Sequence, residues 1–321
     1  MLAVGCLAGA LAGAGCGSRT ESGGADSEFG PVVVTDSVFR GPPDELRVVR
    51  LRDERGTVHE GWLRHVAAAD TTPLRERLSV LLLAGIGTHK RAAEIVPCPP
   101  GVTVLALDYP YRGDRKPSHW NLITSLPAIR EASTATPRGL RAAIRYLATR
   151  PDADPRGVLV IGASFGGSYV LKAVDELPRA RGPEGQDLGP RDVRAVAILY
   201  WGADQPAMAR YRMRERPGWE RATIATALDL FFDDLDPAHT VGSVSPRPLL
   251  LVNGERDEFV SRAAAESLYA AASEPVEQVW LPTEHMQPTS ETLLLELVRI
   301  TMMWQAGLED SAAGPTPGGS P

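Results

Sequence analysis

The stretch with the clearest potential for chemistry is Gly162-Ala163-Ser164-Phe165-Gly166, which follows an apolar run at 158–161. A serine hydroxyl is a poor nucleophile, so a reactive Ser164 needs a sharp turn that exposes its side chain and small neighbours that leave room around it. Gly162 and Gly167 supply that room together with Gly166. The pattern predicts a nucleophile at the junction of a strand and a helix.

A nucleophilic serine needs a base and a carboxylate, and both types of residue follow later apolar runs. Asp257 comes soon after the run at 249–253, and His285 follows the run at 276–281. An imidazole at 285 would take the Ser164 proton and return it to the leaving group. A carboxylate at 257 would hold that imidazole in the required tautomer.

Other carboxylates and histidines compete for these two roles. Three further carboxylates stand near predicted strand ends, namely Glu255, Glu258 and Asp204. The remaining histidines are expected to be structural or at the surface, namely His59, His65, His89, His119 and His239. Of these, His89 is close enough to Gly85-Ile86-Gly87 to line the site. No metal-ligand spacing or phosphate-binding loop is present, so the sequence predicts neither metal nor cofactor.

The elements that would position these residues alternate along the chain. Apolar runs at 78–84, 102–107, 158–161, 193–200, 249–253 and 276–281 predict buried strands, and helical periodicity lies at 137–150, 168–177, 261–272 and 290–304. A β-hairpin is expected at 45–66. This order predicts an α/β fold whose mostly parallel sheet has helices on both faces and an N-terminal antiparallel hairpin. The carboxyl ends of its strands would bring Ser164, Asp257 and His285 together.

Composition and charge limit the other classes of protein. The 321 residues are 43 % hydrophobic and 23 % charged, which is typical of a globular protein with a sizeable core. The net charge of −6 gives no basic surface for nucleic acid. Two of the three cysteines lie in the first sixteen residues, so a disulfide framework is not expected.

The chain is expected to contain one folded domain with extensions at both ends. Residues 1–16 predict an export signal, 17–44 a flexible tether and lead-in, 45–308 the domain, and 309–321 a disordered tail. The segment at about 202–245 interrupts the alternation. It is either a cap over the site or a helical excursion at the surface.

The opening residues contain no charge and end in Ala14-Gly15-Cys16. This ending resembles the lipobox of bacterial lipoproteins, which implies a lipidated Cys16, membrane attachment and an exported, lipid-anchored location. The alternative is an N-terminal extension without this role.

The chain order Ser164, Asp257, His285 resembles that of the α/β-hydrolase superfamily, and the resemblance covers residues 45–308. It implies that Gly85-Ile86-Gly87 forms the oxyanion loop, with the backbone N–H groups of Ile86 and Phe165 as donors. The segment 108–117 resembles the Asp-x-Arg-Gly loop of the dienelactone-hydrolase-like and peptidase-like branches. We interpret that segment as a turn in which Arg112 pairs with an aspartate.

The expected function is that of a serine hydrolase that cleaves a small-molecule acyl ester through an acyl-enzyme intermediate. A serine peptidase, thioesterase or lactonase could use the same three residues. A non-catalytic binding lipoprotein with this fold is the alternative of another class. A haloalkane- or epoxide-type hydrolase would need aspartate in place of Ser164.

Overall fold

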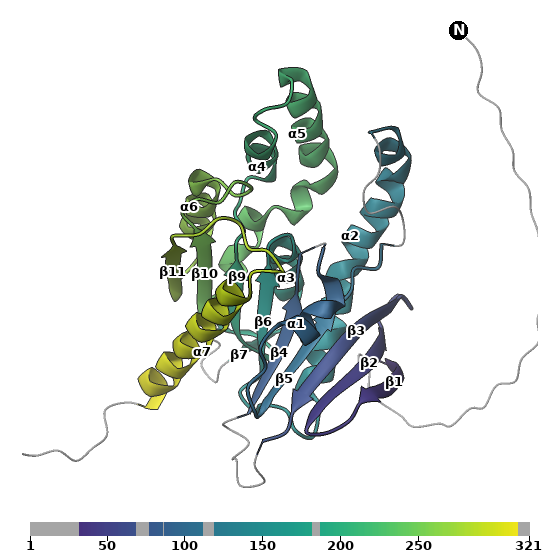
Figure 1. Cartoon of the computed structure of the whole chain (residues 1–321), viewed down its shortest axis with the longest axis vertical. Coiled ribbons are helices and arrows are strands. Elements are labelled where there is room, and N and C mark those ends of the chain that lie inside the picture. Colours follow the sequence, from purple (N-terminus) through teal and green to yellow (C-terminus); the bar gives the residue numbers. More distant parts are fainter. Residues whose placement is uncertain (1–31, 69–76, 86, 112–118, 182–186, 314–321) are drawn as a thin grey trace, which may run out of the picture.

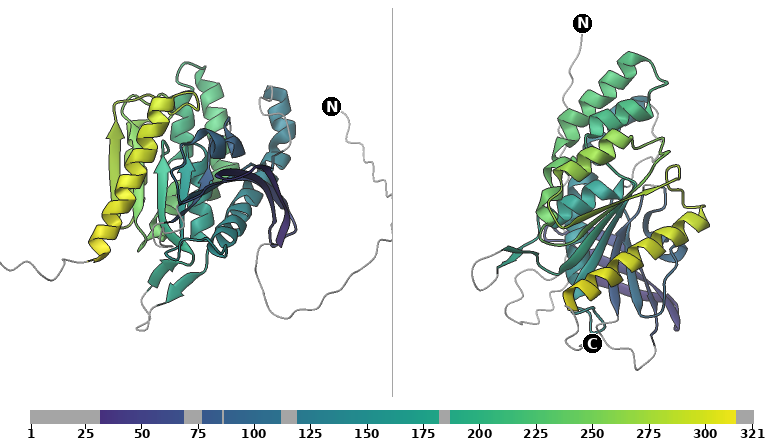
Figure 2. Two further views of the ribbon diagram at one scale, coloured as in Figure 1. Left: turned by 60° about the horizontal axis from the view of Figure 1, so that its bottom comes forward. Right: turned by 90° about the vertical axis from the view of Figure 1, so that its left-hand side faces the viewer.

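A computed structural model of the chain describes residues 32–68, 77–85, 87–111, 119–181 and 187–313. Its centre is a nine-stranded sheet in the order β1-β2-β3-β5-β4-β6-β9-β10-β11 (Figure 1). Helices cover both faces of this sheet, as Figure 2 shows from two further directions. The predicted α/β class, with its mostly parallel central sheet, is confirmed.

The parallel part of the sheet contains β4 (Leu78–Leu83), β5 (Val102–Leu107), β6 (Val158–Ala163), β9 (Val193–Leu199), β10 (Leu249–Gly254) and β11 (Val276–Leu281). All six residues of β4, β5 and β10 are buried, which explains why these strands read as unbroken apolar runs. Side chains alternate between the two faces, so each strand contributes to two separate cores.

The antiparallel part contains three strands, whereas the sequence indicated two. β2 (Asp44–Arg52) and β3 (Val58–Val66) form the predicted hairpin, and β3 pairs with β5. β1 (Val32–Arg40) adds an antiparallel edge strand within the segment expected to be tether and lead-in. Its hydrophobic side chains are exposed, Phe39 by 52 % for example, so β1 lacks the one-sided burial that marks a strand in the sequence.

Two long helices and several short ones cover the sheet. α2 (His119–Ala148) and α3 (Gly166–Asp175) pack on one face, while α1 (Ala92–Ile95) and α7 (Glu291–Ala313) lie over the other (Figure 2). η2 (His89–Arg91) precedes α1, and α6 (Arg262–Ala271) joins β10 to β11. With only four residues, α1 covers little of its face.

Two helices extend beyond their predicted limits. α2 begins 18 residues before Pro137 and contains both Pro127 and Pro137. Ser133, Ala135 and Thr136 are buried in this earlier part, so packing outweighs the local signal of the proline. α7 continues to Ala313, which corrects the prediction that the disordered tail begins at residue 309.

The segment at 202–245 is a helical insertion after β9. It contains α4 (Gln205–Arg212), α5 (Gly218–Phe232) and three short 3₁₀ helices, η3 (Asp233–Leu235), η4 (Pro237–His239) and η5 (Val241–Val244). In Figure 1, α4 and α5 stand beyond the carboxyl ends of the parallel strands. A second small hairpin, β7 (Arg179–Arg181) and β8 (Asp187–Pro190), was not expected from the sequence.

Candidate active site

Ser164 lies at the sharp turn between β6 and α3. Its φ angle is +51°, a left-handed conformation that is rare for a residue with a side chain. A Cβ atom on Gly166 would lie 2.1 Å from the Leu83 carbonyl oxygen, and one on Gly162 would lie 2.8 Å from Gly167 Cα. Only glycine allows strand and helix to approach this closely. The strained turn therefore holds Ser164 out at the carboxyl end of the sheet.

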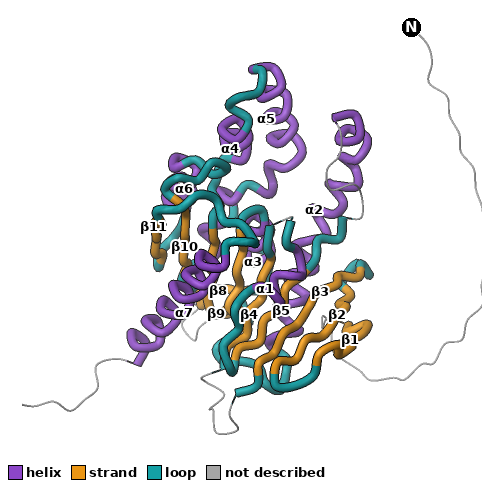
Figure 3. The backbone as a smooth tube through the Cα atoms, in the orientation of Figure 1, coloured by secondary structure: helices purple, strands orange, loops and turns teal. Residues whose placement is uncertain are grey.

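The structure brings Ser164, His285 and Asp257 into one hydrogen-bonded row. Ser164 Oγ lies 2.9 Å from His285 Nε2, and His285 Nδ1 lies 2.7 Å from Asp257 Oδ2. His285 comes from the loop between β11 and α7, which passes over the sheet before α7 begins (Figure 3). In the neutral imidazole that donates Nδ1–H to the carboxylate, Nε2 is free to accept the serine proton.

The loop after β10 fixes the Asp257 carboxylate. Its side chain is 1 % exposed, and Oδ1 accepts hydrogen bonds from the backbone N–H groups of Phe259 at 2.7 Å and Val260 at 2.9 Å. Only Oδ2 is left for the imidazole. The orientation of His285 is therefore set by a carboxylate that cannot rotate without breaking two backbone hydrogen bonds.

The alternative carboxylates have other contacts. Glu258 Oε2 accepts from the backbone N–H of His285 at 3.3 Å, so it supports the loop and not the ring. Asp204 caps α4, accepting from the Ala207 N–H at 2.9 Å. Glu255 is exposed at the strand end. Of the four carboxylates, only Asp257 has a recorded contact with the imidazole.

Aromatic side chains pack around the imidazole. The Phe259 and Tyr200 rings lie 4.8 and 5.8 Å from the His285 ring, both edge to face. The Tyr200 hydroxyl lies 2.5 Å from Thr283 Oγ1 in the same loop, and burial raises the pKa of Tyr200. Arg212 of α4 stacks on Phe259 at 4.2 Å. These rings limit rotation of the His285 side chain. The spacing of residues in the sequence did not identify them as part of the site.

The predicted oxyanion loop is described in part. Ile86 lies outside the described residues, but its neighbour Gly85 comes close to Ser164, because a Cβ there would be 3.7 Å from Ser164 Oγ. The Gly85 carbonyl accepts from the N–H groups of Thr88 and His89, which closes the turn. Phe165 is the N-cap residue of α3, where backbone N–H groups point out of the helix.

Tyr109 links this loop to the elbow. Its hydroxyl donates to the Ala84 carbonyl at 2.6 Å, and its ring lies 6.0 Å from Phe165. Burial raises the pKa of Tyr109 well above its usual value, so the hydroxyl stays protonated and keeps donating. The tyrosine fixes the end of β4, where the oxyanion loop begins.

The other histidines lie away from this row. His59 is buried beside Asp53, at 3.0 Å, and burial lowers its pKa despite that contact. His65 lies 2.8 Å from Thr103 Oγ1, and His239 lies 3.1 Å from the Asp233 carbonyl. The side chain of His119 lies outside the described part of the chain.

His89 follows the predicted oxyanion loop in the sequence and lies next to Asp108. Its Nδ1 is 3.1 Å from Asp108 Oδ1, and Lys90 Nζ is 3.4 Å from Oδ2. Burial acts to raise the pKa of Asp108, but its contacts with His89 and Lys90 outweigh burial and hold the pKa below its usual range. The pairing expected for Arg112 lies outside the described residues. Within the described residues, His89 and Lys90 both contact Asp108.

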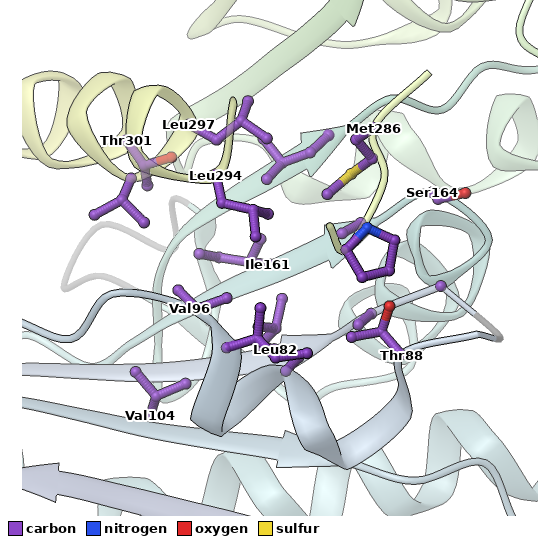
Figure 4. A pocket seen from close by; sticks show the side chains of 18 of the residues that line it. Leu82, Thr88, Val96, Val104, Ile161, Ser164, Met286, Leu294, Leu297 and Thr301 are labelled. Carbon is purple, nitrogen blue, oxygen red and sulfur yellow. The ribbon is translucent and has the colours of Figure 1, made fainter. Parts of the chain in front are cut away.

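A cavity of about 390 Å³ opens at Ser164 and His285 (Figure 4). It continues between the sheet and α7, with walls formed almost entirely by aliphatic side chains such as Leu82, Ile161 and Leu294. Its size is that of a small-molecule site. Arg212 of the insertion lines the cavity, together with Trp201 and Phe259 from outside the insertion. Part of the segment at 202–245 therefore borders the site, as a cap would.

The described residues contain neither a metal-binding cluster nor a membrane-spanning helix. They hold no cluster of histidine, cysteine, aspartate or glutamate that could bind a metal ion. Among the same residues, none of the helices has the length and apolar character needed to cross a bilayer.

Comparison with known proteins places the chain at low identity to its relatives. No protein-family model matches it. An alignment of 182 positions that covers 51 % of this chain is 25 % identical to the uncharacterized protein YfhR of Salmonella typhi. An alignment of 192 positions that covers 54 % of this chain is 26 % identical to YfhR of Escherichia coli K12. These matches span only 58 % and 60 % of the length of the two relatives.

Similar solved structures share the fold. Acetyl xylan esterase 1 from Thermoanaerobacterium sp. has a TM-score of 0.54 at 14 % identity, over 84 % of this chain and 87 % of the other. Acetyl xylan esterase from a Paenibacillus species gives 0.53 at 13 %, over 85 % and 88 %. A hypothetical protein from Pseudomonas aeruginosa gives 0.54 at 16 %, over 83 % and 94 %. The chain has the α/β-hydrolase fold.

Proposed function

We propose that the protein is a serine hydrolase that cleaves carboxylic esters through an acyl-enzyme. The observation that carries this proposal is the row from Ser164 Oγ to His285 Nε2 and from His285 Nδ1 to Asp257, placed at the mouth of an apolar cavity. His285 takes the serine proton as Oγ attacks the ester carbonyl, and then gives it to the leaving alcohol. Water repeats the cycle on the acyl-serine.

Negative charge develops on the carbonyl oxygen during each attack. The backbone N–H of Phe165, at the start of α3, supports the proposal that this oxygen is bound there, with Ile86 as the second donor. The helix N-terminus adds a favourable dipole. Each such donor is worth about 3 kcal/mol of transition-state stabilisation in acyl transfer.

The character of the cavity favours an ester over a peptide. A peptide carries N–H and C=O groups on both sides of its scissile bond, and burying them without hydrogen-bond partners is costly. Aliphatic side chains such as Leu82 and Leu297 offer no such partners. A thioester or lactone has no N–H groups that need hydrogen-bond partners, so the same site could hydrolyse these compounds.

The test is labelling with a fluorophosphonate, which reacts with activated serines, together with hydrolysis of p-nitrophenyl butyrate. We expect the wild-type protein to be labelled and active, and Ser164→Ala to lose labelling and at least about 10³-fold in kcat. Ser267→Ala, an exposed serine on α6, is the matched control and should match the wild type. Equal labelling of wild type and Ser164→Ala would contradict the proposal and favour a non-catalytic binding role.

We also propose that the protein is exported and anchored to a membrane by a lipid on Cys16. The support is the apolar sequence that ends in Ala14-Gly15-Cys16, which resembles a lipobox. These residues lie outside the described part of the chain.

A further inference from the structure

The cavity at Ser164 follows the whole length of the central strands, and strand register divides its floor into three levels. Leu82 pairs with Ile161 nearest the serine, and Val80 pairs with Leu159 in the middle. Leu78 of β4, paired with Val102 of β5, forms the far level. All six side chains are aliphatic and line the same cavity, so the floor is apolar from one end of the strands to the other.

The roof of the cavity is α7, which begins just after the loop that carries His285. Leu294, Val298 and Met302 line the cavity from successive turns of this helix. At a rise of ~1.5 Å per residue, the eight steps from residue 294 to residue 302 cover about 12 Å along the helix. Figure 4 shows Leu294 and Leu297 facing Leu82 and Ile161 across the space, with Thr301 at the far side.

Small differences in burial show that this face of the sheet is not filled by the protein itself. Leu78, Val80 and Leu82 each keep 6 % of their surface, whereas Leu81 and Leu83 on the opposite face keep 0 %. On that opposite face, α2 and α3 pack directly on the strands. The four-residue α1 and the single helix α7 leave a continuous space on the near face.

The length of this space indicates what it holds. Leu83 pairs with Gly162, two residues before Ser164, so Leu78 lies seven residues of strand from the serine, or about 23 Å at ~3.3 Å per residue. A C–C bond of ~1.5 Å at a tetrahedral angle advances an extended chain by about 1.3 Å per carbon. The space can take about 18 carbons, and the level of Val80 corresponds to about 12.

We infer that the cavity is a channel for a long-chain acyl group, so that the substrates are esters of fatty acids with about 12 to 18 carbons. This inference rests on the proposed esterase function of Ser164. The order of the reaction assigns the channel to the acyl part. The alcohol leaves first, after protonation by His285, while the acyl chain stays bonded to Ser164 Oγ. An alcohol held deep in the channel would have to pass that acyl group to leave.

The experiment measures kcat/KM for p-nitrophenyl esters of 4, 8, 12 and 16 carbons, with the longer ones dispersed in a fixed excess of neutral detergent. Each methylene moved from water into the channel is worth up to about fourfold. We expect kcat/KM to rise at least about tenfold from butyrate to octanoate, and palmitate to be hydrolysed. A profile that falls from butyrate to octanoate would overturn the inference.

Substitutions within the channel test its course. Val80→Phe should lower the ratio of the palmitate rate to the butyrate rate at least about tenfold, because the added ring blocks the middle level. Val298→Phe narrows the channel from α7 and serves if Val80→Phe does not fold. Leu295→Phe is the matched control, because Leu295 is 49 % exposed on the same helix. Equal palmitate rates in all of these proteins would overturn the inference.

Two further comparisons distinguish an error in the channel assignment from an error in the proposed esterase function. Methyl palmitate and hexadecyl acetate have the long chain on opposite sides of the ester, and faster hydrolysis of hexadecyl acetate would overturn the acyl assignment. Ser164-dependent hydrolysis of butyrate without any gain for longer chains would overturn the channel and leave the esterase proposal standing. If neither butyrate hydrolysis nor fluorophosphonate labelling depends on Ser164, both proposals fail.

Discussion

Replacement of Asp257 by asparagine tests the proposed role of the row most directly, because the structure dictates how the new side chain must orient. The Oδ1 position receives two backbone N–H donors, from Phe259 at 2.7 Å and Val260 at 2.9 Å. An amide NH₂ group at this position would face two backbone N–H groups, and all of these are hydrogen-bond donors. The asparagine oxygen must therefore take this position. Its NH₂ group then faces His285 Nδ1, where the carboxylate oxygen stood.

An NH₂ group at that place requires His285 Nδ1 to be an acceptor, which moves the ring proton to Nε2. Nε2–H then points at Ser164 Oγ and cannot take its proton. We expect kcat to fall by ~10⁴-fold, as in other enzymes with this triad, with the fold intact. The barrier would rise by about 5 kcal/mol, since each tenfold loss is ~1.4 kcal/mol.

The assay is hydrolysis of p-nitrophenyl butyrate with circular dichroism as a check on folding. Glu258→Gln is the matched control. That carboxylate accepts a hydrogen bond from the His285 backbone N–H at 3.3 Å, and the amide oxygen of glutamine can accept the same hydrogen bond. We expect its kcat to stay within about tenfold of wild type. A loss of less than about tenfold in Asp257→Asn would refute the tautomer argument. A comparably large loss of kcat in Asp204→Asn would instead assign the role of the carboxylate to Asp204, at the end of β9.

Three further predictions concern the rest of the chain. Gly139→Ala should lower the free energy of unfolding by about 1–3 kcal/mol in urea denaturation, because its Cβ would lie 2.4 Å from His59 Nδ1, which Asp53 holds in place. Gly307→Ala, whose added Cβ would meet no atom within 4 Å, should be neutral or stabilising by up to about 1 kcal/mol. A larger loss of stability in Gly307→Ala than in Gly139→Ala would show that His59 can move. Burial raises the pKa of the Cys98 thiol to about 11, so its alkylation by iodoacetamide, followed by mass spectrometry, should be slow at pH 8 and rise steadily towards pH 11. In urea the alkylation rate should stop rising once the pH exceeds the ordinary thiol pKa of ~8.5. The same plateau in the folded protein would contradict the prediction. The full chain made in a bacterial host should fractionate with membranes, and Cys16→Ser should release it, whereas cytosolic, uncleaved wild-type protein would contradict lipidation.

Strong local patterns made the core strands predictable from the sequence. The predicted strand at 276–281 matches β11 at both ends, and the elbow was located from Gly162, Ser164 and Gly166. Their signals are local, since an apolar run stops where a strand ends and glycine is needed where backbones nearly touch. Asp257 and His285 could be assigned to the same site from the sequence, because parallel strands place their carboxyl ends at one edge of the sheet.

Features that depend on tertiary packing could not be predicted in this way. β1 exposes its apolar side chains, and the first half of α2 is held by the burial of residues such as Ser133. The channel is a clearer case. Leu78, Val80 and Leu82 look in sequence like their neighbours Leu81 and Leu83, because an apolar run does not show whether another side chain or a space faces it.

The insertion after β9 is attached to the residues that orient the imidazole. The Tyr211 hydroxyl at the end of α4 donates to the Asp257 carbonyl at 3.2 Å, and Arg212 stacks on Phe259, whose ring packs on His285. Displacement of α4 would therefore shift both the loop that carries Asp257 and the His285 imidazole. Mechanical coupling of this kind makes the turnover rate sensitive to the position of α4. Substitutions that shift this helix will change the rate of the chemical step without touching Ser164.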